Sequence, residues 1–421
     1  MPSNPPRNHP RPRPRMWLAA SALALAANTA AAQPGTPLQA LFEQAWQLQP
    51  EARALPLRRQ AAQAQRSSAD AWTPEPAALE LESKTDRVGS RQGEREYTVG
   101  LALPLWLPGE RARRAALGDA ELQAVHSAAQ AAQLQLAGRV RDAWWQWQRA
   151  CGELTLAQDQ EGSAKTLEAD VARRLAAGDM ARSDHYQAQA GVAQAQAAVA
   201  QARGGCTAAR TALTALGGGP QLPVAGDSLG MESTPALGQA PGVPPEHPTL
   251  AEGERQAALA RRQAELIAVQ TRANPELTLS AASARGQAGE SYQQSVTLGV
   301  RLPLGAGVRA QAREAAALAQ ALEADTRVQR ERERLAADIQ SAQAQAGAAA
   351  AQEQAMARNA ELARATRGFV AKAFSLGEAD WPTRLRVEQD AQLAERQWQR
   401  ARVDAAAATS TLRQALGLLP E

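Results

Sequence analysis

The chain has 421 residues, 44% of them hydrophobic but only 4% aromatic, and a formal net charge of +3. Length alone allows two or three globular domains, but alanine supplies most of the apolar share, and alanine favours closely packed helices over a large mixed core. Once the four arginines in a removable leader (Arg7, Arg11, Arg13 and Arg15) are set aside, 42 basic residues face 43 acidic ones, so no nucleic-acid partner is expected.

The first 32 residues have the order of a secretory signal peptide. A basic, proline-rich stretch ends at Arg15, an apolar run covers residues 16–27, and small residues at 30–32 precede Gln33. The alternative is a permanent membrane anchor, but the apolar run falls short of the roughly 20 residues that a membrane-spanning helix needs. We therefore predict a signal peptide over residues 1–32, cleavage after Ala32 and an exported mature chain.

The mature sequence contains an internal repeat. The segment VGLALPL at 99–105 corresponds to LGVRLPL at 298–304, an offset of 199 residues, and Ala-Leu-Gly recurs near the end of each copy. We predict a first structural repeat over 33–216, a Gly/Pro-rich connector over 217–248 and a second repeat over 249–421. Each repeat is expected to contain a helix, two strands and a long helical hairpin, and the connector is expected to pack against the outside of the body.

Two pairs of short segments alternate between apolar and polar residues, as strands with two different faces do. The predicted apolar, lipid-facing side chains are Leu79, Leu81, Tyr97, Val99, Leu101, Leu277, Leu279, Val296, Leu298 and Val300. The predicted polar, lumen-facing side chains are Glu80, Glu82, Thr98, Thr278, Thr297 and Arg301. A soluble, half-buried sheet would alternate in the same way. The membrane reading is favoured because the segments approach the 9 to 11 residues of a tilted membrane-crossing strand and the polar face carries charges that suit a water-filled lumen.

Two very long helices are predicted, over residues 110–177 and about 309–374. No proline interrupts either tract, and both are dominated by good helix formers such as Ala, Gln, Leu, Arg and Glu. The first would be roughly 100 Å long, which is too long for a compact domain, so the helices are expected to form coiled coils or a tube. The alternative is a fibrous cytoplasmic coiled coil, which the export signal and the paired strands disfavour.

Cys151 and Cys206 are predicted to lie at the same height in an antiparallel helical hairpin. Each stands 27 residues from the turn at Gly178-Asp179, and in an oxidising compartment such a pair is expected to form a disulfide. Two independent buried thiols remain the alternative, because the Cα atoms must also come within about 7 Å of each other. A metal site on these cysteines is not expected, since neither His126 nor His185 falls near them.

This organisation resembles the TolC family of outer-membrane efflux proteins over essentially the whole mature chain. The repeated strand-Pro-Leu segments that run into helix starts, the glycines at the two hairpin turns and the Ala-Leu-Gly helix ends carry the resemblance. It implies an α+β membrane protein, a homotrimer whose 12-stranded transmembrane β-barrel has four strands per chain and continues as a 12-helix periplasmic α-barrel. It also implies a location in the outer membrane with a long periplasmic portion, contact with outer-membrane lipid, and two partners: a periplasmic adaptor protein and an inner-membrane pump of the resistance-nodulation-division type.

The second hairpin turn indicates a subfamily. Residues 373–380 (AFSLGEAD), followed by Leu385-Arg386, resemble the tip of the CzcC-like and CusC-like heavy-metal outer-membrane factors. The first tip departs from the drug-efflux type because Asp179 stands where an apolar residue is expected. We therefore predict a passive duct for heavy-metal cations. A duct for drugs or for type I protein secretion is the alternative, and a periplasmic adaptor or coiled-coil protein is a more distant one.

Charged residues gather near both predicted tips. The candidate tip or gate residues are Gly178, Asp179, Asp184, Gly377, Glu378 and Asp380. Rings of charge at a constriction can select ions by sign, and Asp184 and Asp380 are the best candidates for an entrance ring. The alternative is that these carboxylates cap helices or are solvated.

The remaining motifs predict no chemistry. The cluster of Trp144, Trp145 and Trp147 is interpreted as packing between a helix and the connector rather than as a ligand cage. No catalytic motif, nucleotide-binding loop or Cys/His cluster with metal spacing is found, so we expect no enzyme activity, no cofactor and no resident metal.

Overall fold

The computed structural model describes Met1 and residues 36–89, 91–217, 231–235, 242–304 and 307–421. Contacts divide the chain into two units, Met1–Gly35 and Thr36–Glu421, and the description below concerns the second unit. The predicted signal peptide, apart from Met1, and much of the predicted connector lie outside the described residues.

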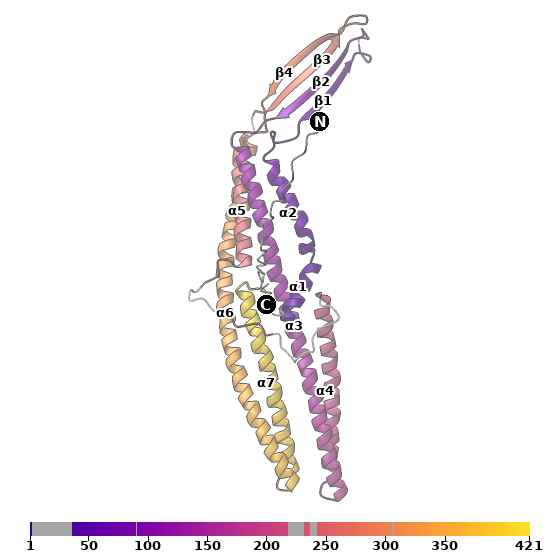
Figure 1. Ribbon diagram of the computed structural model, residues 1–421, viewed down its shortest axis with the longest axis vertical. Helices are drawn as coiled ribbons and strands as arrows, with labels where there is room; N and C mark the ends of the chain where they lie inside the picture. Colours follow the sequence, from indigo (N-terminus) through magenta and orange to yellow (C-terminus); the bar gives the residue numbers. More distant parts are fainter. Residues whose placement is uncertain (2–35, 90, 218–230, 236–241, 305–306) are drawn as a thin grey trace. The chain divides into compact units, whose positions relative to one another are not determined.

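The helices and strands follow each other in two similar series (Figure 1). The first series comprises α1 (Pro37–Leu48), α2 (Pro50–Ser68), β1 (Ala78–Thr85), β2 (Arg95–Pro104), α3 (Glu110–Ala177) and α4 (Arg182–Ala215). The second comprises α5 (Pro248–Val269), β3 (Glu276–Arg285), β4 (Gln293–Arg301), α6 (Gly307–Leu376) and α7 (Trp381–Ala415). Each series thus contains two antiparallel strands followed by a helical hairpin.

The first series opens with two helices where the sequence suggested one. Gln49 has an extended backbone (φ −68°, ψ 140°) and separates the two helices, and Pro50 is the first residue of α2. Proline disfavours the helical conformation in the residue before it and has no N–H to donate, but it is well suited to the first turn of a helix. The chain therefore breaks at Gln49 and resumes as a separate helix.

Two long helices, α3 with 68 residues and α6 with 70, dominate the fold. Gly178 (φ 86°) ends α3 and Gly377 (φ 81°) follows α6, so both chain reversals use the left-handed conformation that glycine adopts without strain. After these turns α4 packs along α3 and α7 along α6, while α3 also contacts α5 and α7. Among the described residues, no helix is both long enough and apolar enough to cross a membrane.

The four strands form one antiparallel sheet in the order β1-β2-β3-β4. The pairing of β2 with β3 joins the two series, with Val99 opposite Ala281 and Leu101 opposite Leu279. Strands β1 and β4 are the two edges, and each is paired along one side only within this chain. The sheet therefore carries free backbone donors and acceptors along both edges.

The largest apolar core surrounds the three tryptophans of α3. Trp144, Trp145 and Trp147 are at most 3% exposed, and their cluster includes Leu38 from α1 and Val403 from α7. The described apolar partners come from neighbouring helices, and most of the connector, which the sequence predicts as a further partner, lies outside the described residues. The cluster is a packing core that joins α1 and both hairpins.

Candidate functional site

The strand register gives the sheet two chemically different faces. Directly opposed residues in antiparallel strands point to the same side, and successive residues alternate. One row across the four strands is Leu79, Leu101, Leu279 and Leu298, and the adjacent row is Glu80, Gly100, Ser280 and Thr297. All ten side chains that the sequence predicts as apolar-facing share the first face, and all six predicted as polar-facing share the second.

The apolar face is bare in the single chain. Leu81, Val296 and Leu298 are 73%, 75% and 70% exposed. Soluble proteins rarely leave a contiguous apolar patch of this kind uncovered, and such a patch marks a contact with a membrane or a partner. On the opposite face the carboxylate of Glu276 accepts a hydrogen bond from Arg301 at 3.3 Å, and this face retains its charges in an open environment.

A buried carboxylate organises the junction between the strands and the long helices. Glu110, the first residue of α3, is fully buried, and its carboxylate accepts hydrogen bonds from the side-chain amides of Gln270 (2.7 Å) and Asn274 (2.6 Å). The backbone N–H of Leu107 also donates to it, at 3.1 Å. Glu110 thus holds the segment after β2 in the first series against the segment before β3 in the second. The internal repeat predicts this strand-to-helix junction but does not single out Glu110.

The hairpin turns carry the predicted gate carboxylates. Asp179, Glu378 and Asp380 are exposed and Asp184 is half-buried. The Asp380 carboxylate accepts a hydrogen bond from the Thr383 backbone N–H at 3.1 Å, and hydrogen bonds from Thr383 lower the pKa of Asp380. The Asp184 carboxylate accepts from the Ala181 backbone N–H at 3.3 Å. Both side chains therefore cap the helices that leave the turns, and this capping holds each of them beside a turn.

The two hairpins of the chain touch each other near their turns, which the sequence did not indicate. Arg174 of α3 donates to the backbone carbonyl of Phe374 at 2.8 Å, and its guanidinium carbon lies 4.1 Å from the centre of the Phe374 ring. Phe374 and Trp381 are 6% and 5% exposed and pack against Val171 of α3. An apolar cluster with a cation over its aromatic ring thus links the turn regions of α3 and α6.

A disulfide links the two helices of the first hairpin. The sulfurs of Cys151 in α3 and Cys206 in α4 are bonded, with the Cα atoms 4.6 Å apart. The link stands well away from the turn, at the level where Cys151 borders the tryptophan core. The two helices of the first hairpin are therefore joined covalently at a level far from their turn.

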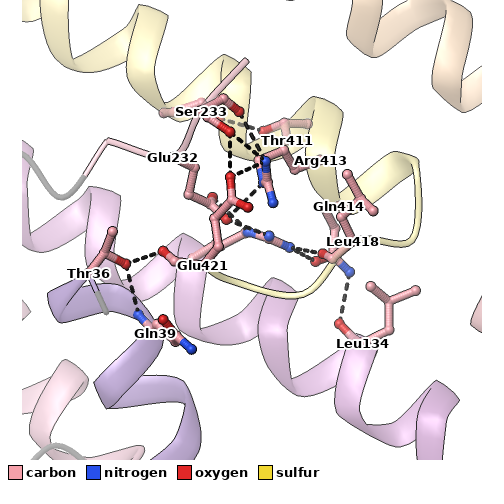
Figure 2. Close-up of polar contacts among 12 residues, drawn as sticks. Thr36, Gln39, Leu134, Glu232, Ser233, Thr411, Arg413, Gln414, Leu418 and Glu421 are labelled. Carbon is pink, nitrogen blue, oxygen red and sulfur yellow. Dashed lines mark hydrogen bonds and ion pairs between the residues drawn. The ribbon is translucent and has the colours of Figure 1, made fainter. Parts of the chain in front are cut away.

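A buried ionic cluster ties the connector to both series (Figure 2). Glu232, in the described part of the connector, is 6% exposed, and its carboxylate accepts hydrogen bonds from Arg141 of α3 at 2.6 and 3.0 Å. Arg413 of α7 lies 3.3 Å from the same carboxylate and 2.6 Å from the carboxylate of Glu421. The hydroxyl of Thr36 donates to the backbone carbonyl of Glu421. The expectation of a connector on the outside of the body is therefore incomplete, because Glu232 is enclosed.

Comparison with known proteins gives a family match over the first series of helices and strands. Residues 41–219 match the family model described as "Outer membrane efflux protein". No curated protein sequence matches the chain. Among solved structures the chain is similar to the outer membrane protein VceC of Vibrio cholerae, with 18% identity, a TM-score of 0.71, and 91% of this chain and 97% of VceC covered.

Two further solved structures share the fold over nearly the whole chain. CusC is 18% identical with a TM-score of 0.73, covering 91% of this chain and 92% of CusC. The open state of the MtrE outer membrane channel of Neisseria gonorrhoeae is 18% identical with a TM-score of 0.71, covering 91% of this chain and 89% of MtrE. At this identity the structures establish the fold. The chain therefore has a TolC-like channel fold, with four antiparallel strands and long helical hairpins, and residues 41–219 within it resemble the outer membrane efflux protein family.

Proposed function

We propose that the protein is a passive exit duct of the outer membrane. The observation that carries the proposal is the four-stranded sheet, with one bare apolar face, one polar face and two edges that lack partners within the chain. Lipid cannot satisfy the backbone hydrogen bonds of open edges, so a sheet in a membrane must close on itself. Four strands are too few to close around a water-filled space. Three copies would supply the twelve strands that the resemblance to the TolC family implies.

The helical hairpins extend the proposed duct into the periplasm. Each chain has two hairpins built on α3 and α6, so three copies would line a tunnel of twelve helices. The apolar sheet face (Leu79, Val99 and Leu298 among others) would contact outer-membrane lipid. The polar face would line the lumen, where Glu80 and Glu82 favour cations over anions.

The proposed duct takes its driving force from elsewhere in the cell envelope. The resemblance implies a periplasmic adaptor that engages the hairpin turns and an inner-membrane pump of the resistance-nodulation-division type. In this proposal the protein performs no chemical reaction. The tip residues Gly178, Asp179, Asp184, Gly377, Glu378 and Asp380 form the region that the adaptor opens, and Asp184 and Asp380 lie at its entrance.

Conductance across a planar lipid bilayer tests the duct directly. Purified mature protein should run as a trimer in mild detergent and insert as a pore whose conductance scales with salt concentration. Protein that stays monomeric and leaves the bilayer insulating would refute the proposal. Heat-unfolded protein from the same preparation is the matched control.

Heavy-metal cations are the substrate class that we propose. The resemblance of residues 373–380 to the CzcC-like and CusC-like tips supports this class, as do the carboxylates on the polar face of β1. A strain lacking the gene should become more sensitive to heavy-metal salts and regain resistance when the wild-type gene is returned. Increased sensitivity to drugs alone, or loss of a secreted protein, would favour drug efflux or type I secretion instead.

A further inference from the structure

Trp72 is the most exposed tryptophan among the described residues, at 95%. It lies in the short segment between α2 and β1, six positions before the first residue of β1. Within the described chain it makes no hydrogen bond or ring contact. A large aromatic side chain held fully in water is unfavourable, since fully burying such a side chain is typically a substantial stabilisation.

The exposure of Trp72 is not the result of a loose loop, because the backbone around it is held by side chains. Arg111 donates to the carbonyls of Ala69 (3.0 Å) and Asp70 (2.7 Å), and Arg114 donates to the carbonyl of Pro74 at 3.1 Å. The indole N–H of Trp106 donates to the carbonyl of Ala71 at 3.2 Å. Four carbonyls on both sides of Trp72 are thus bonded to the strand-to-helix segment that follows β2.

Two of these donors, Arg114 and Trp106, also contact each other. The guanidinium carbon of Arg114 lies 5.2 Å from the centre of the Trp106 ring, in cation–π geometry. Gly118 of α3 allows the end of α2 to approach, because a Cβ at that position would lie 2.7 Å from the Cα of Arg66. The end of α2 and the beginning of α3 are therefore packed closely, and residues of α3 and the segment before it hold the backbone on both sides of the exposed Trp72.

The position of Trp72 identifies its partner. The start of β1 and the ends of β2 and β4 share one end of the antiparallel sheet, where the chain passes into the helices. Other apolar side chains are exposed at this end, including Leu105 (40%), Leu304 (86%) and Val308 (81%). Leu105 and Leu304 follow β2 and β4, and Val308 lies in the first turn of α6. A tryptophan at the border between an apolar strand face and a polar helical region has the placement that its amphipathic ring favours at the headgroup level of a membrane.

We propose that Trp72 is an interfacial anchor that inserts into the headgroup and acyl boundary of phospholipids in the periplasmic leaflet of the outer membrane. The anchor fixes the depth at which the sheet sits, and Arg111, Arg114 and Trp106 are positioning residues that hold it. This inference rests on the proposed outer-membrane duct. The alternative occupant is the edge strand β4 of a second copy, and the experiment below separates the two.

Quenching by brominated lipid tests the anchor. Mature wild-type protein, Trp72→Phe and a matched control, Trp398→Phe, are reconstituted in phosphatidylcholine vesicles with bromines near the top of the acyl chains. Trp398 lies on α7, donates its indole N–H to Glu353 and is stacked with Arg364. We expect the brominated lipid to quench a clear share of the tryptophan emission of wild type and of Trp398→Phe. In Trp72→Phe most of this quenching should be absent.

Two results would overturn the anchor. Quenching of Trp72→Phe equal to that of wild type would show that Trp72 does not meet lipid. A Trp72→Phe protein that dissociates from trimers in detergent while its lipid quenching is unchanged would assign the side chain to the contact between copies. Neither result affects the conductance of the wild-type protein, so failure of the anchor is distinguishable from failure of the duct.

Discussion

Glu232 places a negative charge inside the protein between two arginines. The side chains of Glu232, Arg141 and Arg413 are 0%, 3% and 6% exposed. Removing one member of a buried ion pair leaves an uncompensated charge, at a cost of about 3–5 kcal/mol. We predict that Glu232→Gln lowers the free energy of unfolding by about that amount, measured by denaturant titration in detergent.

An exposed ion pair supplies the control for this variant. Asp404 and Arg149 are 2.9 Å apart, with 47% and 43% of their side chains exposed, and pairs of this kind contribute about 1 kcal/mol or less. Asp404→Asn should therefore change stability little. Equal effects of the two variants would contradict the assignment of Glu232 as a buried ionic tie.

His247 introduces a pH dependence at the start of α5. Its side chain is 2% exposed and lies against Gly417, and burial lowers the pKa of the imidazole below its ordinary value of 6.5, although the backbone of Ala415 and then the charge of Glu331 oppose the shift. The unfolded chain then binds a proton more readily than the folded chain. The stabilisation from the neutral ring is complete above pH 6.5 and is lost as the pH falls through 6.5 toward the lower folded value.

For His247 the predicted quantity is the change of melting temperature with pH, not the stability at one pH. The melting temperature of wild type should fall between pH 7 and pH 5, and that of His247→Asn should fall less over the same range. The variant loses packing at every pH, so only the difference in slope reports the titration. Parallel curves for the two proteins would exclude His247 as the titrating group.

At the scale of elements, the two faces of β2 should respond differently to the same charge. Val99 lies on the apolar face and its neighbour Thr98 on the polar face. An arginine on the lipid face of a membrane strand costs about 2–4 kcal/mol near the bilayer midplane, whereas lumen positions change selectivity instead. We predict that Val99→Arg reduces the amount of folded, heat-resistant trimer and that Thr98→Arg keeps the trimer but lowers cation selectivity. Unimpaired assembly of Val99→Arg would place this face away from lipid.

The sequence is most informative about elements whose signals are local. The 110–177 prediction coincides with α3 because no proline interrupts the tract and Gly178 provides a left-handed end. The alternation of side chains likewise predicted which strand residues share a face. The break between α1 and α2 was not predicted, although Pro50 is a local signal for it.

At the scale of the whole molecule, contacts between distant segments could not be predicted. Nothing in the connector distinguishes Glu232 as a buried residue, since its burial depends on Arg141 and Arg413 arriving from helices 91 and 181 positions away in the sequence. The contact of Arg174 with Phe374 depends in the same way on two hairpins lying side by side. Such contacts follow from packing, which a single sequence does not encode in any periodic pattern.

The central claim is that the free edges of the sheet close against other copies, with β1 of one chain beside β4 of the next. Cross-linking tests it most directly: cysteine is placed at Leu81 in β1 and, in turn, at Gln294, Val296 and Leu298 in β4. Within one chain these edges are three strand spacings apart, about 14 Å, which is beyond the reach of a disulfide.

Closure between copies predicts covalent dimers and trimers, and nothing larger, for at least one cysteine pair after oxidation in membranes. Each single-cysteine variant should stay monomeric on a denaturing gel. Monomers from every pair, in protein that is folded and membrane-bound, would contradict closure of the sheet between copies.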